Sequence, residues 1–156
     1  MRKRLIEKNL PDDSTEAGAW LDLQGLASVE VTSEQADFPI ESVFGGEQGA
    51  GWRASAAGEQ VIRLIFDEPQ NVRRIEVRFS ETDVERTQEF LLQWAPRGGA
   101  MKEIVRQQWN FSPDGAKSEV EDYQVDLNGV SVLQLTINPD ITHGHAPASL
   151  SQWRVA

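Results

Sequence analysis

The stretch Ile75-Glu76-Val77-Arg78-Phe79 decides the fold class, because apolar and charged side chains alternate along it without a break. Successive side chains of a β-strand point to opposite faces, so this pattern places one face against a core and the other in water. Similar patterns predict nine strands, near residues 27–33, 51–54, 60–66, 72–80, 88–95, 101–110, 120–127, 130–138 and 148–155.

Residues typical of turns separate these stretches. They are Asp67–Asn71, Pro96–Gly99, Ser112–Gly115, Asn128–Gly129 and Asn138–Asp140. Strands at such short spacing, with no long helical pattern between them, indicate antiparallel sheets. We therefore predict an all-β protein, an antiparallel β-sandwich of the jelly-roll kind.

Two short segments favour a helix instead. Pro39–Phe44 could make one turn, opened by its proline and ended by Gly45, and Ser14–Ala17 carries an N-cap signature. We interpret residues 1–25 as a polar leader that packs on the domain through Trp20. Residues 26–156 are then the β-sandwich domain.

The composition limits the number of domains and the kinds of partner. At 156 residues the chain has room for one domain, because single cores usually span about 100–200 residues. Asp and Glu total 25 against 15 Lys and Arg, so the formal net charge of −10 would repel a phosphate backbone. We expect no nucleic-acid partner. The absence of cysteine excludes disulfides, thiolate nucleophiles and cysteine-based zinc sites.

The distribution of apolar residues argues against export and against a membrane span. Met1–Lys8 has the basic start of a signal peptide, but only Leu5 and Ile6 precede the next charge. No run of large apolar residues exceeds three, whereas a membrane span needs ~20. We therefore expect a soluble, cytoplasmic protein.

The order of several short motifs resembles the discoidin or coagulation factor type C domain. The motifs are Val31-Thr32-Ser33, a Pro-led turn, Gly45-Gly46, Gly51-Trp52-Arg53-Ala54-Ser55, Gln60–Asp67 and Ala148-Ser149-Leu150. Over roughly residues 26–156, the resemblance implies the galactose-binding-like jelly roll. It also implies a non-catalytic binding module, commonly for carbohydrate and sometimes for lipid headgroups or protein surfaces. The stretch Ile104–Pro113 is similar to one found in a group of short bacterial proteins, a likeness that implies no activity.

One departure from the resemblance concerns calcium. Where the family usually has Asp-Gly, this chain has Gly45-Gly46, and the lost carboxylate weakens a hard oxygen site. Glu41, Glu47 and backbone carbonyls could still supply ligands. We predict no cofactor, with a structural calcium ion left open.

Motifs for catalysis or metal binding are incomplete. The glycine-rich stretch Gly45–Gly51 lacks the Lys-Ser/Thr of a phosphate cradle, and no Gly-x-Ser-x-Gly elbow is present. His143 and His145 could hold a metal with Asp140, but the spacing supplies neither a third ligand of known geometry nor a second shell. The acidic clusters at residues 81–85 and 119–122 are interpreted as solvated faces. We therefore predict that the protein is not an enzyme and has no metal site formed by these residues.

The tryptophans divide into core and surface candidates. Trp52 and Trp94 are expected in the core, because large aromatic residues are usually buried. Trp109 and Phe111 end a strand and enter a turn, where an aromatic face could meet solvent and stack on a sugar ring. Packing at the end of a strand is the alternative for both rings.

Connections alternate between the two ends of an antiparallel sandwich, so the loops at 55–59, 81–87, 111–119 and 139–147 should share one end. This end would collect aromatic, amide, charged and imidazole groups, which suit a carbohydrate or glycoconjugate. A protein-interaction or assembly module is the alternative, and a small hydrolase is less favoured. The predicted ligand-binding residues are Glu81, Arg86, Trp109, Asn110, Phe111, His143 and His145.

Overall fold

The computed structural model describes residues 20–45 and 49–156, and most of its regular elements are strands, which confirms the all-β class. The helix predicted at Ser14–Ala17 lies outside the described residues. In chain order the elements are α3 (Leu23–Leu26), β1 (Ala27–Val31), η1 (Ile40–Val43), β2 (Trp52–Arg53), β3 (Gln60–Ser80), β4 (Arg86–Pro96), β5 (Lys102–Phe111), β6 (Ser118–Asn138), β7 (Ser149–Leu150) and β8 (Gln152–Val155).

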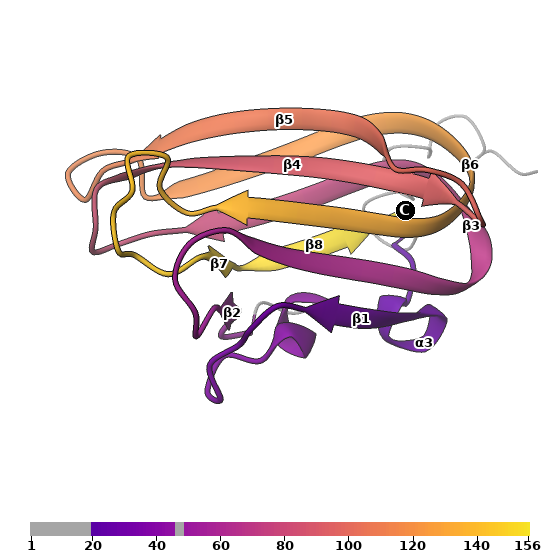
Figure 1. The fold of residues 1–156 in the computed structure, drawn as a ribbon, viewed down its shortest axis with the longest axis horizontal. Coiled ribbons are helices and arrows are strands. Elements are labelled where there is room, and N and C mark those ends of the chain that lie inside the picture. Colours follow the sequence, from indigo (N-terminus) through magenta and orange to yellow (C-terminus); the bar gives the residue numbers. More distant parts are fainter. Residues whose placement is uncertain (1–19, 46–48) are drawn as a thin grey trace, which may run out of the picture.

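The two longest strands, β3 and β6, pair antiparallel and belong to both layers of a sandwich (Figure 1). Residues 60–66 and 130–137 lie in a first layer of strand order β1-β3-β6-β4-β5. Residues 72–80 and 118–127 form a second layer with β8, which pairs with β3. Phe79 of the second layer packs on Phe90 of the first, with ring centroids 5.3 Å apart. The predicted β-sandwich is confirmed.

Two of the predicted turns are bends within these long strands. β3 continues through Asp67–Asn71, where the register with β6 shifts, and β6 continues through Asn128–Gly129, where Gly129 adopts φ +69°. The prediction of four separate strands is therefore wrong here. Bulges insert extra residues and bend a strand without ending its pairing. The strand predicted at 148–155 is also divided, into β7, which pairs with β2, and β8.

The short helical segments agree in part with the sequence. The predicted turn at Pro39–Phe44 is confirmed as the 3-10 helix η1. The single turn α3 was not predicted, although its signal is local, because the Asp22 carboxylate caps it by accepting from the Gly25 N–H at 3.3 Å. Within the described residues no helix is long and apolar enough to cross a membrane.

Trp20 packs on the outer face of the second layer, at the start of the described residues. The guanidinium groups of Arg74 and Arg154 lie 4.8 and 4.2 Å from its ring centroid. The Leu21 N–H donates to the Val155 carbonyl at 2.7 Å. Trp20 therefore packs on the second layer. The interpretation of residues 1–25 as a leader that packs on a domain at 26–156 stays a prediction.

The core lies between the layers, and Trp52 is fully buried in it, as predicted. Its Nε1 donates to the Ser33 carbonyl at 2.9 Å, so the indole is satisfied as well as packed. Gly51 precedes it at φ +82°, where a Cβ would lie 2.9 Å from the Leu150 carbonyl oxygen, so this approach requires glycine. Trp94 packs against the same core but keeps part of its surface exposed.

Candidate functional site

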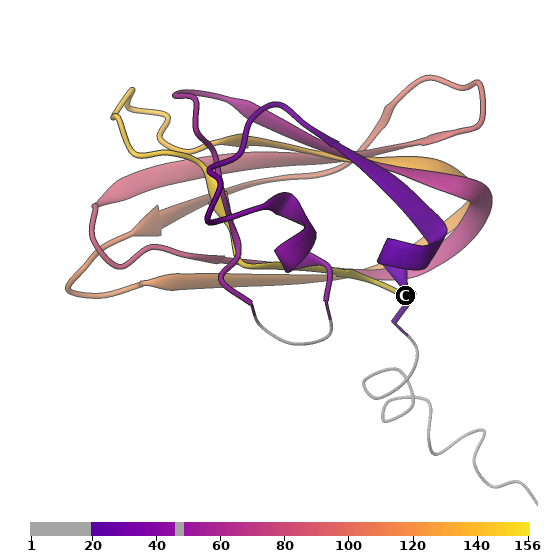
Figure 2. The same ribbon diagram turned by 90° about the horizontal axis from the view of Figure 1, so that it is seen from below.

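Four loops gather at the end of the sandwich away from the C-terminus, here called the loop end (residues 54–59, 81–85, 112–117 and 139–148; Figures 1 and 2). Backbone hydrogen bonds join them: the Glu81 N–H donates to the Lys117 carbonyl at 2.8 Å, and the Ala54 N–H donates to the Ala148 carbonyl at 2.9 Å. The predicted grouping of loops is confirmed. The four loops still meet at one end although β3 and β6 were each predicted as two strands. Each of these long strands bends at the opposite end and returns to the end where it began.

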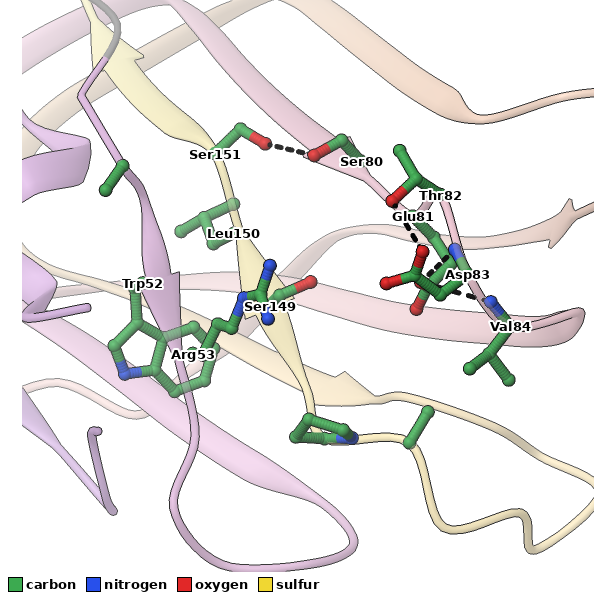
Figure 3. Close-up of a pocket in the computed structure, with 13 residues that line it drawn as sticks. Trp52, Arg53, Ser80, Glu81, Thr82, Asp83, Val84, Ser149, Leu150 and Ser151 are labelled. Atoms are coloured by element: carbon green, nitrogen blue, oxygen red, sulfur yellow. Dashed lines mark hydrogen bonds between the residues drawn. The ribbon is translucent and has the colours of Figure 1, made fainter. Parts of the chain in front are cut away.

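A polar cavity of about 250 Å³, here called the loop-end pocket, opens at this end (Figure 3). Two of its walls are β2 and the turn after β3, and segments around β7 complete it. The lining residues are Ala50, Trp52, Arg53, Ser80, Glu81, Thr82, Asp83, Val84, Ala146, Pro147, Ser149, Leu150 and Ser151. Of the seven predicted ligand-binding residues, Glu81 is the one that lines this cavity.

Glu81 holds the turn that forms one wall of the pocket. Its Oε1 accepts from Arg86 Nε at 2.8 Å, and its Oε2 accepts from the N–H groups of Asp83 and Val84 at 3.0 and 3.3 Å. Burial alone would raise the pKa of Glu81, but these hydrogen bonds and the charge of Arg86 outweigh it and lower the pKa. Both oxygens are engaged, so Glu81 shapes the pocket more than it offers acceptors to a ligand.

Arg53 and Asp83 are the charged groups of the lining left without an ion-pair partner in the part of the chain that the structure describes. The Arg53 guanidinium lies 4.4 Å from the Phe38 ring centroid, and the residue is exposed. Asp83 Oδ1 accepts from Thr82 Oγ1 at 3.2 Å. Arg53 can donate several hydrogen bonds and Asp83 can accept them, which suits a ligand rich in hydroxyl groups.

Neither residue is among the predicted ligand-binding residues. Arg53 follows the buried Trp52 on a strand of two residues, so alternation alone predicts an outward side chain. That signal was available. Asp83 has no comparable signal, because its neighbours in the pocket come from β2 and β7, far away in the chain.

Arg86 and Phe111 lie beneath the loops. The Arg86 side chain is fully buried, with Nη1 donating to Gln88 Oε1 at 3.1 Å and to the Pro139 carbonyl at 2.8 Å. Its guanidinium carbon lies 4.8 Å from the Phe111 ring centroid. The expectation that Phe111 faces solvent is wrong, because Phe111 ends β5 inside the sandwich under this cation.

The expectation that residues 119–122 form a solvated face is wrong for Glu119. It is 1% exposed, and its Oε1 accepts from Gln88 Nε2 at 3.3 Å. Burial raises the pKa of Glu119, and the neighbouring Glu121 carboxyl raises it further. A polar layer formed by Arg86, Gln88 and Glu119 therefore lies between the two sheets under the loop end.

Trp109 and Asn110 lie on β5 outside the pocket. Trp109 is half-buried against the core, in register with Gln88, and its Nε1 has no hydrogen-bond partner among the described residues. Asn110 is exposed and accepts a hydrogen bond from Thr87. Neither side chain joins Arg53 and the other lining residues.

His143 and His145 are exposed on the loop at 139–148, at the loop end but outside the pocket lining. Asp140 orders the loop: its Oδ1 accepts from the Thr142 N–H at 3.0 Å and from Thr142 Oγ1 at 2.6 Å. Those hydrogen bonds lower the pKa of Asp140. His143 adopts φ +66°, in the left-handed region that few residues other than glycine adopt. A ligand role for the two imidazoles stays a prediction.

Side chains that could hold a metal ion are scattered over the part of the chain that the structure describes. Within residues 20–45 and 49–156 no three His, Asp or Glu side chains group as ligands. In the glycine turn considered for calcium, the Gly45 carbonyl accepts from Gln152 Nε2 at 3.4 Å. Gly46 and Glu47 lie outside the described residues, so the absence of a cofactor, with a structural calcium ion left open, stays a prediction.

Comparisons of sequence and of structure give different results. No protein-family model and no curated protein matches the sequence. Among solved structures, a family 32 carbohydrate-binding module of Clostridium perfringens NanJ in complex with galactose is similar, with a TM-score of 0.63 and 16% identity over 87% of this chain and 96% of that one.

Two further structures show the same likeness. A Clostridium perfringens module of the same family in complex with GalNAc-β-1,3-galactose has a TM-score of 0.65 and 14% identity, covering 87% of this chain and 98% of that chain. A pectin-binding carbohydrate-binding module has a TM-score of 0.58 and 15% identity, covering 83% and 89%. The fold of this chain is therefore the galactose-binding-like jelly roll, the β-sandwich of discoidin domains and family 32 carbohydrate-binding modules.

Proposed function

We propose that the protein is a non-catalytic binding module that holds one carbohydrate unit, free or at the end of a glycoconjugate, in the loop-end pocket. Arg53 and Asp83 carry this proposal, because they place in one polar cavity a cation and a carboxylate that have no ion-pair partner among the described residues. Sugar hydroxyls both donate and accept, so neighbouring hydroxyls can meet both charges at once.

The size and lining of the pocket support a small ligand. Its volume of about 250 Å³ lies just below the ~300–1,000 Å³ of pockets for drug-sized molecules. The hydroxyls of Ser80 and Ser151, 3.1 Å apart, and of Thr82 and Ser149 add further donors and acceptors. Trp52 lines the pocket but is fully buried, so hydrogen bonds rather than ring stacking would provide most of the affinity.

The experiment is a calorimetric titration with galactose, GalNAc-β-1,3-galactose and pectin oligosaccharides, the ligand types named for similar structures. Arg53→Gln and Asp83→Asn should each weaken binding by about 10-fold or more, because a charged hydrogen bond contributes ~1.5–3 kcal/mol. Arg97→Gln makes the same charge change in the exposed turn between β4 and β5, and should leave binding unchanged. Equal affinity in wild type and Arg53→Gln would contradict the proposal.

A protein ligand at the same pocket is the second candidate. Val84 is 42% exposed at the pocket wall, and an exposed aliphatic side chain beside polar groups is typical of protein contacts. A glycan array without binding, together with capture of one partner that Arg53→Gln abolishes, would favour this candidate. Turnover of a glycosidase or esterase substrate that Asp83→Asn abolishes would instead favour the hydrolase.

The cytoplasmic location stays a prediction. Fractionation of the source cells, followed by immunoblotting, tests it directly.

A further inference from the structure

Arg86 connects two loops of the loop end with the polar layer beneath them. Its Nε donates to Glu81, which holds the turn at 81–85, and its Nη1 donates to the Pro139 carbonyl in the loop at 139–148. The same Nη1 donates to Gln88 Oε1, and Gln88 in turn donates to Glu119. One buried cation therefore lies between the pocket wall and a buried glutamate.

Two polar atoms in this network have no hydrogen-bond partner among the described residues. Arg86 Nη2 is a donor without an acceptor, and Glu119 Oε2 accepts no hydrogen bond. Both residues are at least 98% buried, so neither atom can turn to bulk water. Burying an unsatisfied polar group costs about 1–3 kcal/mol. The two atoms are complementary, and the Gln88 amide contacts both residues.

The charge of Glu119 and of the groups around it decides whether Arg86 Nη2 and Glu119 Oε2 form a hydrogen bond. Glu121 and Tyr123 face it from β6, Arg86 approaches from β4, and Phe79, its partner on β3, is apolar. A protonated Glu119 carboxyl attracts Arg86 weakly. An ionised Glu119 would be a second carboxylate for the same guanidinium, in competition with Glu81.

We propose that Arg86 is a positioning residue shared between Glu81 and Glu119: when Glu119 loses its proton to solvent, it draws the guanidinium away from Glu81 and loosens the wall of the loop-end pocket. The wall responds because Glu81 has one cationic partner, Arg86, in the described structure. Weaker anchoring of Glu81 also weakens its hydrogen bonds from the N–H groups of Asp83 and Val84. Asp83 then loses its fixed place in the pocket.

The test follows Glu119 and the pocket wall in the same sample. Side-chain ¹³C shifts report the ionisation of Glu119 between pH 5 and pH 10, and carbon-detected spectra report the backbone ¹⁵N shifts of Asp83 and Val84. The backbone shifts should move in step with the Glu119 titration in wild type. They should show no such step in Glu119→Gln, which mimics the protonated carboxyl. Glu89→Gln makes the same charge change on an exposed ion pair with Arg106 and should behave as wild type.

Three results would overturn the inference. The first is a Glu119 carboxyl that is ionised throughout the range. The second is a titration of Glu119 that leaves Asp83 and Val84 unmoved. The third is the same step in Glu119→Gln, which would assign it to another group.

A second measurement links this inference to ligand binding and rests on the proposed function. The affinity for galactose should fall about fivefold or more between pH 6 and pH 9 in wild type and stay constant in Glu119→Gln. If no saccharide binds at any pH, the proposed function fails. The spectra still decide the sharing of Arg86, because they need no ligand. If galactose binds with the same affinity at both pH values, the coupling to the pocket is wrong.

Discussion

Glu76 and Glu119 are buried glutamates on neighbouring strands, and their carboxyl groups have opposite pKa shifts. Glu76 is 5% exposed on the outer face of the second layer and accepts from Arg78 at 2.9 Å and from Arg154 at 2.7 Å. Burial alone would raise the pKa of Glu76, but these hydrogen bonds and charges outweigh burial and lower it.

Glu119 has no such support. It lies between the layers, accepts one neutral hydrogen bond from Gln88, and has Glu121 two residues away on the same face. Burial and this neighbour raise its pKa to about 9. Both side chains are at least 95% buried, so the groups beside them decide the direction of the shift: two arginines lower the pKa of Glu76, whereas the Glu121 carboxyl adds to the effect of burial on Glu119. The outer face of the second layer supplies Arg78 and Arg154, the latter stacked on Trp20. Among the described residues the interior supplies Arg86 alone, and Arg86 is already bound to Glu81.

Removal of that interior arginine should have the largest effect. Arg86→Met should lower the free energy of unfolding by about 3–5 kcal/mol, because it leaves the carboxylate of Glu81 beside a cavity without its cation. Urea denaturation measures the change. Arg154→Met is the matched control on the outer face, where Arg78 still pairs with Glu76 and the side chain is 23% exposed, so its effect should be smaller. Equal losses of unfolding free energy in Arg86→Met and Arg154→Met would show that the interior and the outer face do not differ in this respect.

Glu119→Gln should stabilise the protein at alkaline pH. The pKa of Glu119 is raised from 4.5 in the unfolded chain to about 9, so the wild type loses stability as pH rises between these values. The variant cannot ionise and should be the more stable at pH 9, by on the order of 1–3 kcal/mol. Urea midpoints at pH 5, 7 and 9 test this. A wild-type profile that runs parallel to that of the variant would contradict the assignment.

Glu76→Gln should change the pH profile in the opposite direction. Because the pKa of Glu76 is lowered, its contribution is present above the unfolded pKa of 4.5 and is lost as pH falls through the folded pKa. The variant should therefore be less stable than wild type at pH 7, by about 1–2 kcal/mol, and the difference should shrink under acid. Thermal melts at pH 7 and pH 3 measure both. A difference that grows on acidification would be the wrong sign.

Glu89→Gln should have the smallest effect. Glu89 pairs with Arg106 at 2.9 Å on the outer face of the first layer, where Arg106 is 51% exposed. Solvent screens such a pair, so the loss should not exceed about 0.5 kcal/mol and should disappear at high salt. Urea titrations with and without 1 M NaCl measure this change. A loss as large as that of Glu76→Gln would show that burial and the number of arginine donors do not set the contribution of a glutamate to stability.

The fold was predictable from the sequence because the alternation of apolar and polar residues along a strand is a local signal. Ile75–Phe79 and Leu133–Ile137 form strands with the faces that their alternation predicts. The bends at Asp67–Asn71 and Asn128–Gly129 were not predictable. Turn-forming residues such as Pro69, and a glycine at positive φ such as Gly129, occur in tight turns and in bent strands, and the pairing partner more than 50 residues away decides between them.

The site was predictable only as far as topology goes. Alternating connections bring the correct loops together, and Glu81 lines the pocket that they form. The burial of Arg86 depends on the Pro139 carbonyl, 53 residues away, as well as on the nearby Glu81 and Gln88, and a contact at that distance leaves no local pattern. Charged and aromatic residues next to a turn therefore look alike in the sequence, whether they face solvent or stack under a loop as Phe111 does.

The sharing of β3 and β6 by both layers has a consequence for how the molecule comes apart. A conventional sandwich can in principle separate into two sheets, each keeping its own hydrogen-bond ladder. Here the same pair of strands carries the ladders of both layers, from Gln60↔Ile137 to Ser80↔Ser118. A rupture at the bends therefore propagates into both sheets, and the domain behaves as one cooperative unit without a stable half. The most slowly exchanging amides of the two layers should share a single opening event.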